Sequence, residues 1–282
     1  GSGNWSSAGT WDTGVPADTD AVVIASGHTV VFDADQSGFG TGIGDLTING
    51  TLNVSTTTST NMRITAAKAI RGTGTFNIGT AGAAIPFAVK FTLTGGAGWG
   101  FNGGDTTGLT VNIYGTEPTN KWVQFSGNEA IGQTELSVGT NVTGEASYWK
   151  TGDEVIACSY KGSGETEFLT IASVAAGAIT MTGGLVSAKV TENYLVLLSR
   201  NVTITFVATT NGFSNFKDGK LHIGSARIIA ANNYCINSCI NPVMSGGVIQ
   251  PTAIGSQTAC YSSSLPLTGG AIVGVNKIGR AH

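Results

Sequence analysis

Five aromatic residues around a glycine-rich segment are the part of this sequence that best fits ligand chemistry. Trp99, Phe101 and Tyr114 lie in or beside the segment GGAGWGFNGGD, and Trp122 and Phe125 follow soon after it. Aromatic rings on a surface with little charge hold neutral sugars, because the ring packs against the sugar while nearby polar groups bind its hydroxyls. We take these five residues as the candidate carbohydrate-binding site. The alternative is that the rings fill a junction inside the fold, since large aromatic side chains usually bury area.

Carboxylates do not form the pairs that sugar hydrolysis needs. Glycosidases use two acids about 5–10 Å apart, yet Asp218 is the single acid between residues 200 and 282. We therefore predict no catalytic residue, and we favour a non-enzymatic function over an enzymatic one. A polysaccharide depolymerase with a site between chains, or outside this piece, stays open as an alternative.

The other acids have structural interpretations. Those near the start are expected to cap turns rather than bind Ca²⁺, namely Asp12, Asp18, Asp20, Asp33 and Asp35. Those in the middle of the chain are expected at solvated hairpin edges, namely Asp153, Glu154, Glu165 and Glu167.

Histidine and cysteine spacing predicts no metal site and no cofactor. His28, His222 and His282 are far apart in sequence, and none has a second histidine at ligand spacing. His222 with its charged neighbours is expected to be a surface face of the fold rather than an active site; those neighbours are Asp218, Lys220 and Arg227. The cysteines are expected to be buried thiols, with one Cys235–Cys239 or Cys235–Cys260 disulfide left open.

Composition indicates an all-β fold and argues against nucleic acid and against insertion into a membrane. Charged residues are 11% of the 282, where about 25% is usual, and short Val/Ile/Thr runs replace any long helical period. The net charge of −3 comes without a basic stripe, so nucleic acid is not expected. No apolar run approaches the roughly 18 residues of a membrane span. The chain begins Gly-Ser-Gly and its end shows no cap, so we expect the molecule to continue.

Short strands recur along the chain in the way that stacked coils require. In DLTINGTLNV (45–54), alternation places Leu46, Ile48, Leu52 and Val54 on one side, with the Asn-Gly corner between two strands. The segments 225–229, 245–249 and 268–272 align at coil-like spacing, as do 233–238 and 258–263, which would match Cys235 with Cys260. We predict a right-handed parallel β-helix with a small antiparallel insert: a capped helix over 1–116, the insert over 117–199, and further coils over 200–282.

The opening resembles a known family. The residues TWDTGVPADTDAVVIASGHTVVFD (10–33), then DLTINGTLNV and GTGTFNIG, resemble the eight-glycine domain of extracellular β-helix proteins. The stretches 149–154 and 198–201 carry the resemblance further along the chain. It implies relatives among animal hyaluronan-processing and ciliary proteins, secreted bacterial proteins and phage virion or tail proteins. The low charge here is most like the bacterial and phage members.

The residues and the resemblance together predict a non-catalytic structural or attachment protein. We expect it outside the cell, on a cell surface or on a virion, as a homo-oligomer or bound to other structural proteins, and contacting surface polysaccharide. A carbohydrate-binding module of a secreted bacterial protein is the alternative from another class.

Overall fold

A computed structural model gives the fold of the chain. It describes residues 1–65, 70–94, 99–102, 108–145, 147–158, 166–207, 211–216, 220–230, 234–239, 242–251, 260–262, 271–273 and 278–280. These residues form strands and one short 3-10 helix, η1 (Ala8–Thr10). The prediction of an all-β chain is confirmed.

The chain divides into two compact units. Unit 1 comprises Gly1–Thr116 and Asn201–His282, and unit 2 comprises Glu117–Arg200. Each unit has its own cluster of buried apolar side chains. The units are therefore described separately.

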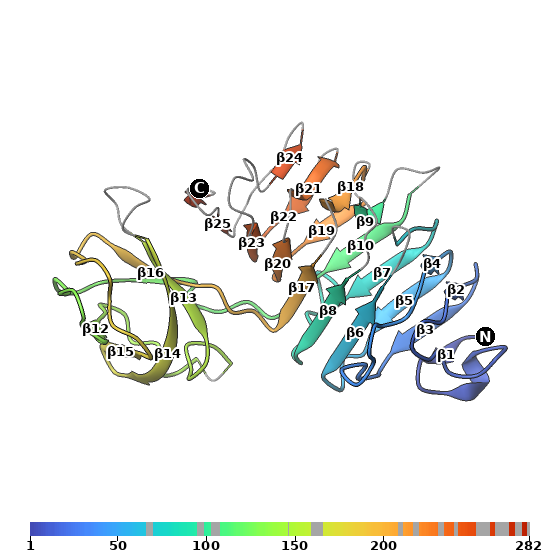
Figure 1. Ribbon diagram of the computed structural model, residues 1–282, viewed down its shortest axis with the longest axis horizontal. Coiled ribbons are helices and arrows are strands. Elements are labelled where there is room, and N and C mark those ends of the chain that lie inside the picture. Colours follow the sequence, from blue (N-terminus) through green and yellow to red (C-terminus); the bar gives the residue numbers. More distant parts are fainter. Residues whose placement is uncertain are drawn as a thin grey trace. The chain divides into compact units, whose positions relative to one another are not determined.

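Unit 1 consists of parallel strands from successive turns of the chain, stacked side by side (Figure 1). The first sheet has the order β1 (Gly3–Asn4), β3 (Thr29–Phe32), β5 (Thr51–Val54), β7 (Thr75–Ile78), β10 (Thr110–Ile113), β19 (Leu221–Ile223) and β22 (Val243–Met244). The second sheet has the order β26 (Ile278–Arg280), β25 (Ala271–Val273), β23 (Val248–Pro251), β20 (Arg227–Ala230), β17 (Val202–Phe206), β8 (Val89–Leu93) and β6 (Thr60–Ile64).

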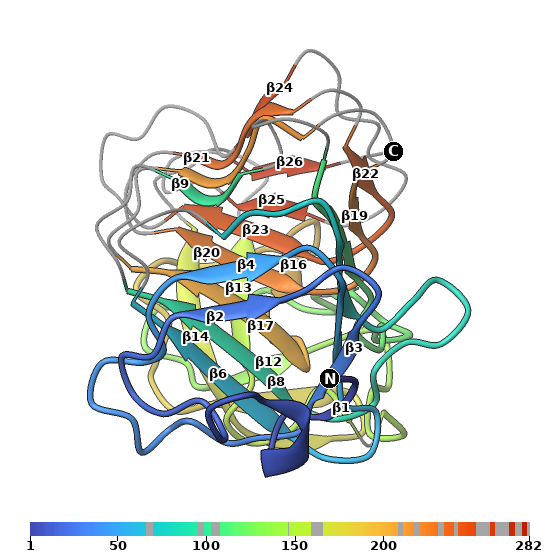
Figure 2. The same ribbon diagram turned by 90° about the vertical axis from the view of Figure 1, so that its right-hand side faces the viewer.

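Two smaller sheets complete unit 1. The third sheet has the order β24 (Cys260–Ser262), β21 (Tyr234–Cys239), β18 (Asn211–Ser214) and β9 (Trp99–Asn102), and β2 (Val22–Ile24) pairs with β4 (Leu46–Ile48). Figure 2 looks along the stack, and the sheets lie on different sides of it. Among the described strand pairs of unit 1, all are parallel except β25 with β26.

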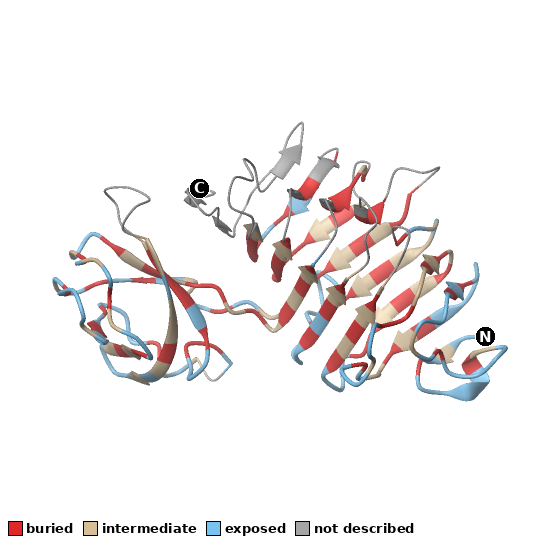
Figure 3. Cartoon of the chain, in the orientation of Figure 1, coloured by how far each residue is buried: buried red, intermediate tan, exposed pale blue. Residues whose placement is uncertain are grey.

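Alternation along the strands places the core between the sheets of unit 1. Buried and half-buried residues alternate in most strands (Figure 3), as the two-residue period of a strand requires. Leu46, Ile48, Leu52 and Val54 are all buried, and Asn49-Gly50 forms the corner between β4 and β5. This part of the prediction is confirmed.

The alignment of the later coils is wrong by one residue at two places. The sequence pattern set Ile229 against Ile249, whereas Ile228 is the residue in register with Ile249. Likewise Cys260 lies opposite Ile236 and not opposite Cys235. At the first place the corner before β23 includes Gly247, at φ +88°, a left-handed conformation that glycine adopts without strain. That corner moves the pairing register of the two similar segments by one residue.

Unit 2 is a six-stranded sheet in which every described pair is antiparallel. Its order is β11 (Trp122–Gln124), β16 (Tyr194–Leu197), β13 (Glu154–Cys158), β14 (Glu167–Ala175), β15 (Ala178–Met181) and β12 (Glu135–Ser137). One face covers a core that includes Val123, Leu195, Val155 and Ile171. The opposite face carries the candidate site.

Candidate functional site: an aromatic face on unit 2

Trp122 is an exposed tryptophan on the face of unit 2 away from its core. Strand β11 alternates, with Val123 buried and its neighbours Trp122 and Gln124 exposed. Trp122 is 46% exposed, and its ring meets the ring of Tyr194 edge-to-face, with centroids 5.0 Å apart. This packing restrains the Trp122 ring while leaving much of it in solvent.

A row of apolar side chains crosses four strands from Trp122. Trp122 pairs with Val196, Val196 with Ile156, and Ile156 with Phe168. Directly paired residues share a face of the sheet, so these four side chains form one line, which we call the apolar row. Ile156 is fully buried, and Phe168 at the far end is 53% exposed. With strands about 4.8 Å apart, the two exposed rings stand roughly 14 Å from each other.

Two of the five aromatic residues predicted from sequence have no surface for a ligand. Phe101 is completely buried in unit 1, stacked on Phe213 with centroids 5.0 Å apart. Phe125 is buried in the core of unit 2. A buried ring cannot stack on a sugar, so the predicted site is corrected by removing both residues.

Two further residues of that set belong to unit 1. Tyr114 is half-buried directly after β10 of the first sheet, and its ring packs directly over Gly224, since a Cβ on that glycine would lie 2.2 Å from the ring. Burial raises the pKa of the Tyr114 phenol. The backbone of Trp99 begins β9, and its side chain lies outside the described residues. Trp122 is the predicted residue that we carry into the proposed site.

Phe168 and Tyr194 are residues that the sequence analysis missed. Both lie in the antiparallel insert that the sequence predicts over 117–199. In EFLTI, Phe168 is out of phase with Ile171, because residues three apart in a regular strand point to opposite faces. That spacing was the available signal for an exposed ring.

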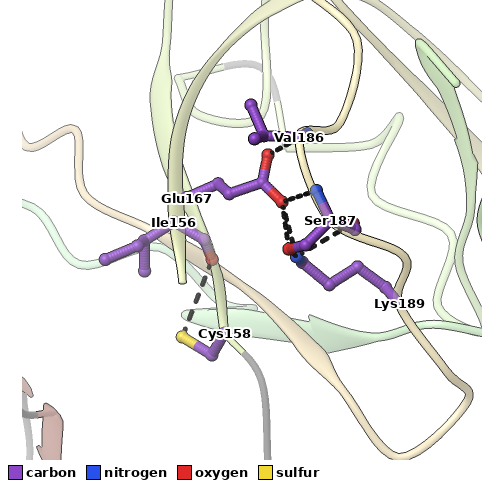
Figure 4. A network of polar contacts seen from close by, with 6 residues as sticks. All are labelled: Ile156, Cys158, Glu167, Val186, Ser187 and Lys189. Atoms are coloured by element: carbon purple, nitrogen blue, oxygen red, sulfur yellow. Dashed lines mark hydrogen bonds and ion pairs between the residues drawn. The ribbon is translucent and has the colours of Figure 1, made fainter. Parts of the chain in front are cut away.

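A buried ion pair joins Lys189 to Glu167, the residue before Phe168 in the sequence (Figure 4). Lys189 Nζ is 2.6 Å from Glu167 Oε1, and the Lys189 side chain has no exposed surface. The same carboxylate accepts the N–H groups of Val186 and Ser187 and the Ser187 hydroxyl, at 2.6, 2.9 and 2.7 Å. Lys189 also donates to the Ser187 carbonyl and hydroxyl. The network ties the chain at 186–189 to the start of β14.

The surroundings of Glu167 favour its ionised form. Burial alone raises the pKa of this carboxyl, but the Lys189 ammonium, the two backbone N–H groups and the Ser187 hydroxyl together outweigh burial. The pKa of Glu167 is therefore lowered from its ordinary value. An ionised Glu167 beside a protonated lysine is a structural anchor rather than a proton donor.

The expectation of solvated hairpin edges holds for one of the four acids in the middle of the chain. Glu154 is exposed, whereas Asp153 is buried and accepts the N–H of Lys150 at 3.1 Å. Glu167 is tied up in its ion pair. Glu165 lies outside the described residues. Asp153 and Glu167 were misassigned because their partners come from turns and segments that strand patterns do not reveal.

Three of the five acids near the start hold turns or loops, as predicted. Asp20 accepts the N–H of Ala17 at 2.8 Å and Asp35 accepts that of Ser37 at 2.8 Å. Asp18 accepts the backbone N–H groups of residues 40, 41 and 42. These hydrogen bonds, led by that from Gly42, lower the pKa of Asp18.

The polar residues around His222 do not gather into one site. His222 lies in the first sheet and Arg227 in the second, where Arg227 donates to the amide oxygen of Gln250 at 2.8 Å. Asp218 lies outside the described residues. His222 Nδ1 is instead 2.8 Å from Asn112 Oδ1, at the end of a ladder in which Asn112 donates to Asn77 and Asn77 to Asn53, each at 2.8 Å.

The two thiols of the later coils that the structure describes are buried. Cys235 Sγ lies 3.9 Å from the Ile228 carbonyl and Cys239 Sγ lies 3.7 Å from that of Phe213. The side chain of Cys260 lies outside the described residues. Buried thiols are thus confirmed for Cys235 and Cys239.

Comparison with known proteins gives a family match and a structural neighbour. No curated protein matches the chain. Among solved structures, the tailspike protein gp49 from Pseudomonas phage LKA1 is similar at 12% sequence identity and a TM-score of 0.28; the match covers 83% of this chain and 37% of the phage protein. The chain therefore spans well under half of that protein.

Two further findings concern the chain itself. In the part of the chain that the structure describes, no helix has the length and apolar character to cross a membrane. Residues 10–126 match the family model of the G8 domain, which supports the family resemblance seen in the opening of the sequence and gives the domain its name.

Proposed function

We propose that this protein is a non-catalytic structural and attachment protein of the cell exterior or of a virion, which contacts neutral surface glycans through unit 2. In this proposal unit 1 is a right-handed parallel β-helix that serves as the scaffold. The parallel pairing of successive turns and the G8 match over residues 10–126 support the scaffold role.

The exposed rings of Trp122 and Phe168 on one face of unit 2 carry the glycan part of the proposal. Exposed apolar side chains that gather on one face, rather than being scattered singly, mark interaction sites. Two rings about 14 Å apart can pack against separate units of one oligosaccharide, and Gln124 on the same strand face as Trp122 offers an amide to hydroxyl groups.

A glycan array followed by calorimetry tests this proposal. We expect wild-type protein to bind at least one neutral glycan, and Trp122→Ala or Phe168→Ala to weaken that binding about tenfold or more, as the loss of a stacked ring does. Phe87→Ala is the matched control, because Phe87 is an exposed aromatic residue of unit 1. It should leave binding unchanged.

Two results would count against the proposal. An array without neutral-glycan binding removes the glycan role. Equal loss of binding in Phe87→Ala and Trp122→Ala would show that the apolar row has no special part in it.

A further inference from the structure

A hollow opens in unit 2 next to the end of the apolar row. Its volume is about 540 Å³, within the range of small-molecule sites. One side is lined by residue 166 and by residues 167–170 at the start of β14. The other side is lined by residues 182–184, 186 and 187, which follow β15. Phe168 belongs both to this lining and to the apolar row.

The hollow exists because β14 loses its neighbour. The pairing of β14 with β15 ends at Ile171 and Met181, after which Thr182 donates to the Thr170 carbonyl at 2.9 Å. Beyond this point the chain leaves the sheet and is held again by Glu167, through the N–H groups of Val186 and Ser187. Two fixed ends with a gap between them make a preformed site.

The lining has the chemistry of a site for an uncharged, hydroxyl-rich ring. Phe168, Leu169 and Val186 provide an apolar surface, and the hydroxyl-bearing side chains Thr166, Thr170 and Thr182 provide hydrogen-bonding groups. Glu167 Oε2 accepts one hydrogen bond, from Val186, and a carboxylate oxygen can accept a second from a ligand hydroxyl.

Charge argues against an acidic ligand. Lysine, arginine and histidine are absent from the described lining, and the nearby Lys189 ammonium has no exposed surface and is neutralised by Glu167. A carboxylate or sulfate brought next to Glu167 would meet a like charge without a compensating cation.

We infer that this hollow binds one uncharged pyranose unit of the glycan that contacts Phe168, and that it selects neutral over acidic sugars. This inference rests on the proposed glycan contact and adds to it the class of sugar and the place where one unit is fixed.

A change of charge at the rim tests the inference. Val186 is 79% exposed and contributes only its backbone N–H to the network, so Val186→Arg keeps the fold and adds a cation to the lining. The probes are galactose, glucose and N-acetylglucosamine tetrasaccharides, and a galacturonate tetrasaccharide, each titrated by calorimetry. Wild-type protein should bind a neutral probe at least about tenfold more tightly than galacturonate, and Val186→Arg should raise galacturonate affinity about tenfold.

The matched control is Ile131→Arg, which replaces another exposed apolar residue of unit 2 that does not line the hollow. It should keep the wild-type selectivity. If Val186→Arg and Ile131→Arg behave alike while Trp122→Ala still weakens neutral-glycan binding, the hollow is not the site and the proposed function stands. If wild-type protein binds no neutral probe, the inference and the glycan role are both overturned.

Discussion

The ammonium group of Lys189 is buried in unit 2, and its ion pair with Glu167 offsets the cost of burying that charge. Taking an ammonium group out of water costs several kcal/mol unless it is paired and hydrogen-bonded. The pairing also fixes the path of residues 186–189 against β14. At the scale of one residue, the shape of the hollow thus depends on a single carboxylate.

We predict that Glu167→Gln destabilises unit 2 by about 3–5 kcal/mol, because the buried ammonium loses its counter-charge. Lys189→Met should cost less, since the carboxylate keeps its donors at Val186 and Ser187. Urea denaturation monitored by hydrogen exchange of unit 2 peptides measures both. Equal stability of wild type and Glu167→Gln would contradict the prediction.

The same pair gives a pH dependence with a definite sign. The pKa of Glu167 is lowered on folding, so its stabilising effect is complete above the ordinary pKa of 4.5 and is lost as pH falls through the folded value. Unfolding of wild-type protein between pH 6 and pH 3 should therefore show a loss of stability in unit 2 that Glu167→Gln lacks.

At the scale of the elements, the corners of unit 1 limit how closely successive turns can stack. A Cβ on Gly74 would lie 1.9 Å from the carbonyl oxygen of Gly50 in the preceding turn. The N–H of Gly74 donates to the Ile48 carbonyl at 2.9 Å, and that of Thr75 to the Gly50 carbonyl at 2.9 Å. The close approach therefore comes with the hydrogen bonds that join the two corners.

Gly74→Ala is expected to destabilise unit 1 by about 3 kcal/mol or more, because a backbone atom rather than a flexible side chain stands in the way. Gly82→Ala is the control, since nothing lies within 4 Å of its Cβ position, and it should change the free energy of unfolding little. Urea denaturation of the two variants compares them. A Gly74→Ala variant as stable as Gly82→Ala would refute the close stacking of these corners.

A row of hydrogen-bonded side chains, the amide ladder, runs across four strands of the first sheet of unit 1. Asn53, Asn77, Asn112 and His222 occupy one register position across β5, β7, β10 and β19. The side-chain amides of Asn112 and Asn77 each donate to the asparagine of the preceding strand, and hydrogen bonds in one direction reinforce one another. Such a row favours the observed register over a slipped one.

At the scale of the whole molecule, unit 2 leaves and rejoins unit 1 at neighbouring points. The N–H of Thr116 and the side-chain amide of Asn201 both donate to the carbonyl of Ile85. The N–H of Gly115 donates to the Ser225 carbonyl at 2.8 Å. The two strands that flank the insert, β10 and β17, are each paired within unit 1.

We therefore predict that residues 117–200 can be replaced by a Gly-Ser-Gly linker without unfolding unit 1. The linker spans a short gap, so its closure costs little entropy. Hydrogen exchange of peptides from 20–64 should match that of the full chain, while glycan binding should vanish. A shortened protein that fails to fold, or that binds glycans as before, would contradict this account.

Much of this protein could be predicted from local patterns, and the exceptions share one cause. Alternation and corner residues located β4 and β5, because a strand's period and the Asn-Gly turn are local properties. Trp122 was found by residue type alone. Phe125 was assigned to the same site although it lies three residues away, a spacing that puts two strand side chains on opposite faces.

What the sequence determined by itself is that the chain forms β-strands, where many of them lie and which residues of a strand share a face. Only the tertiary structure decided which face is buried, which residues pair and where charges are covered. Phe101 is buried in the core, whereas Phe168 is exposed. Cys260 pairs with Ile236 rather than with Cys235, and Lys189 forms its ion pair with Glu167 of β14. Burial and register depend on partners distant in the chain, and a one-residue slip between them reverses every face.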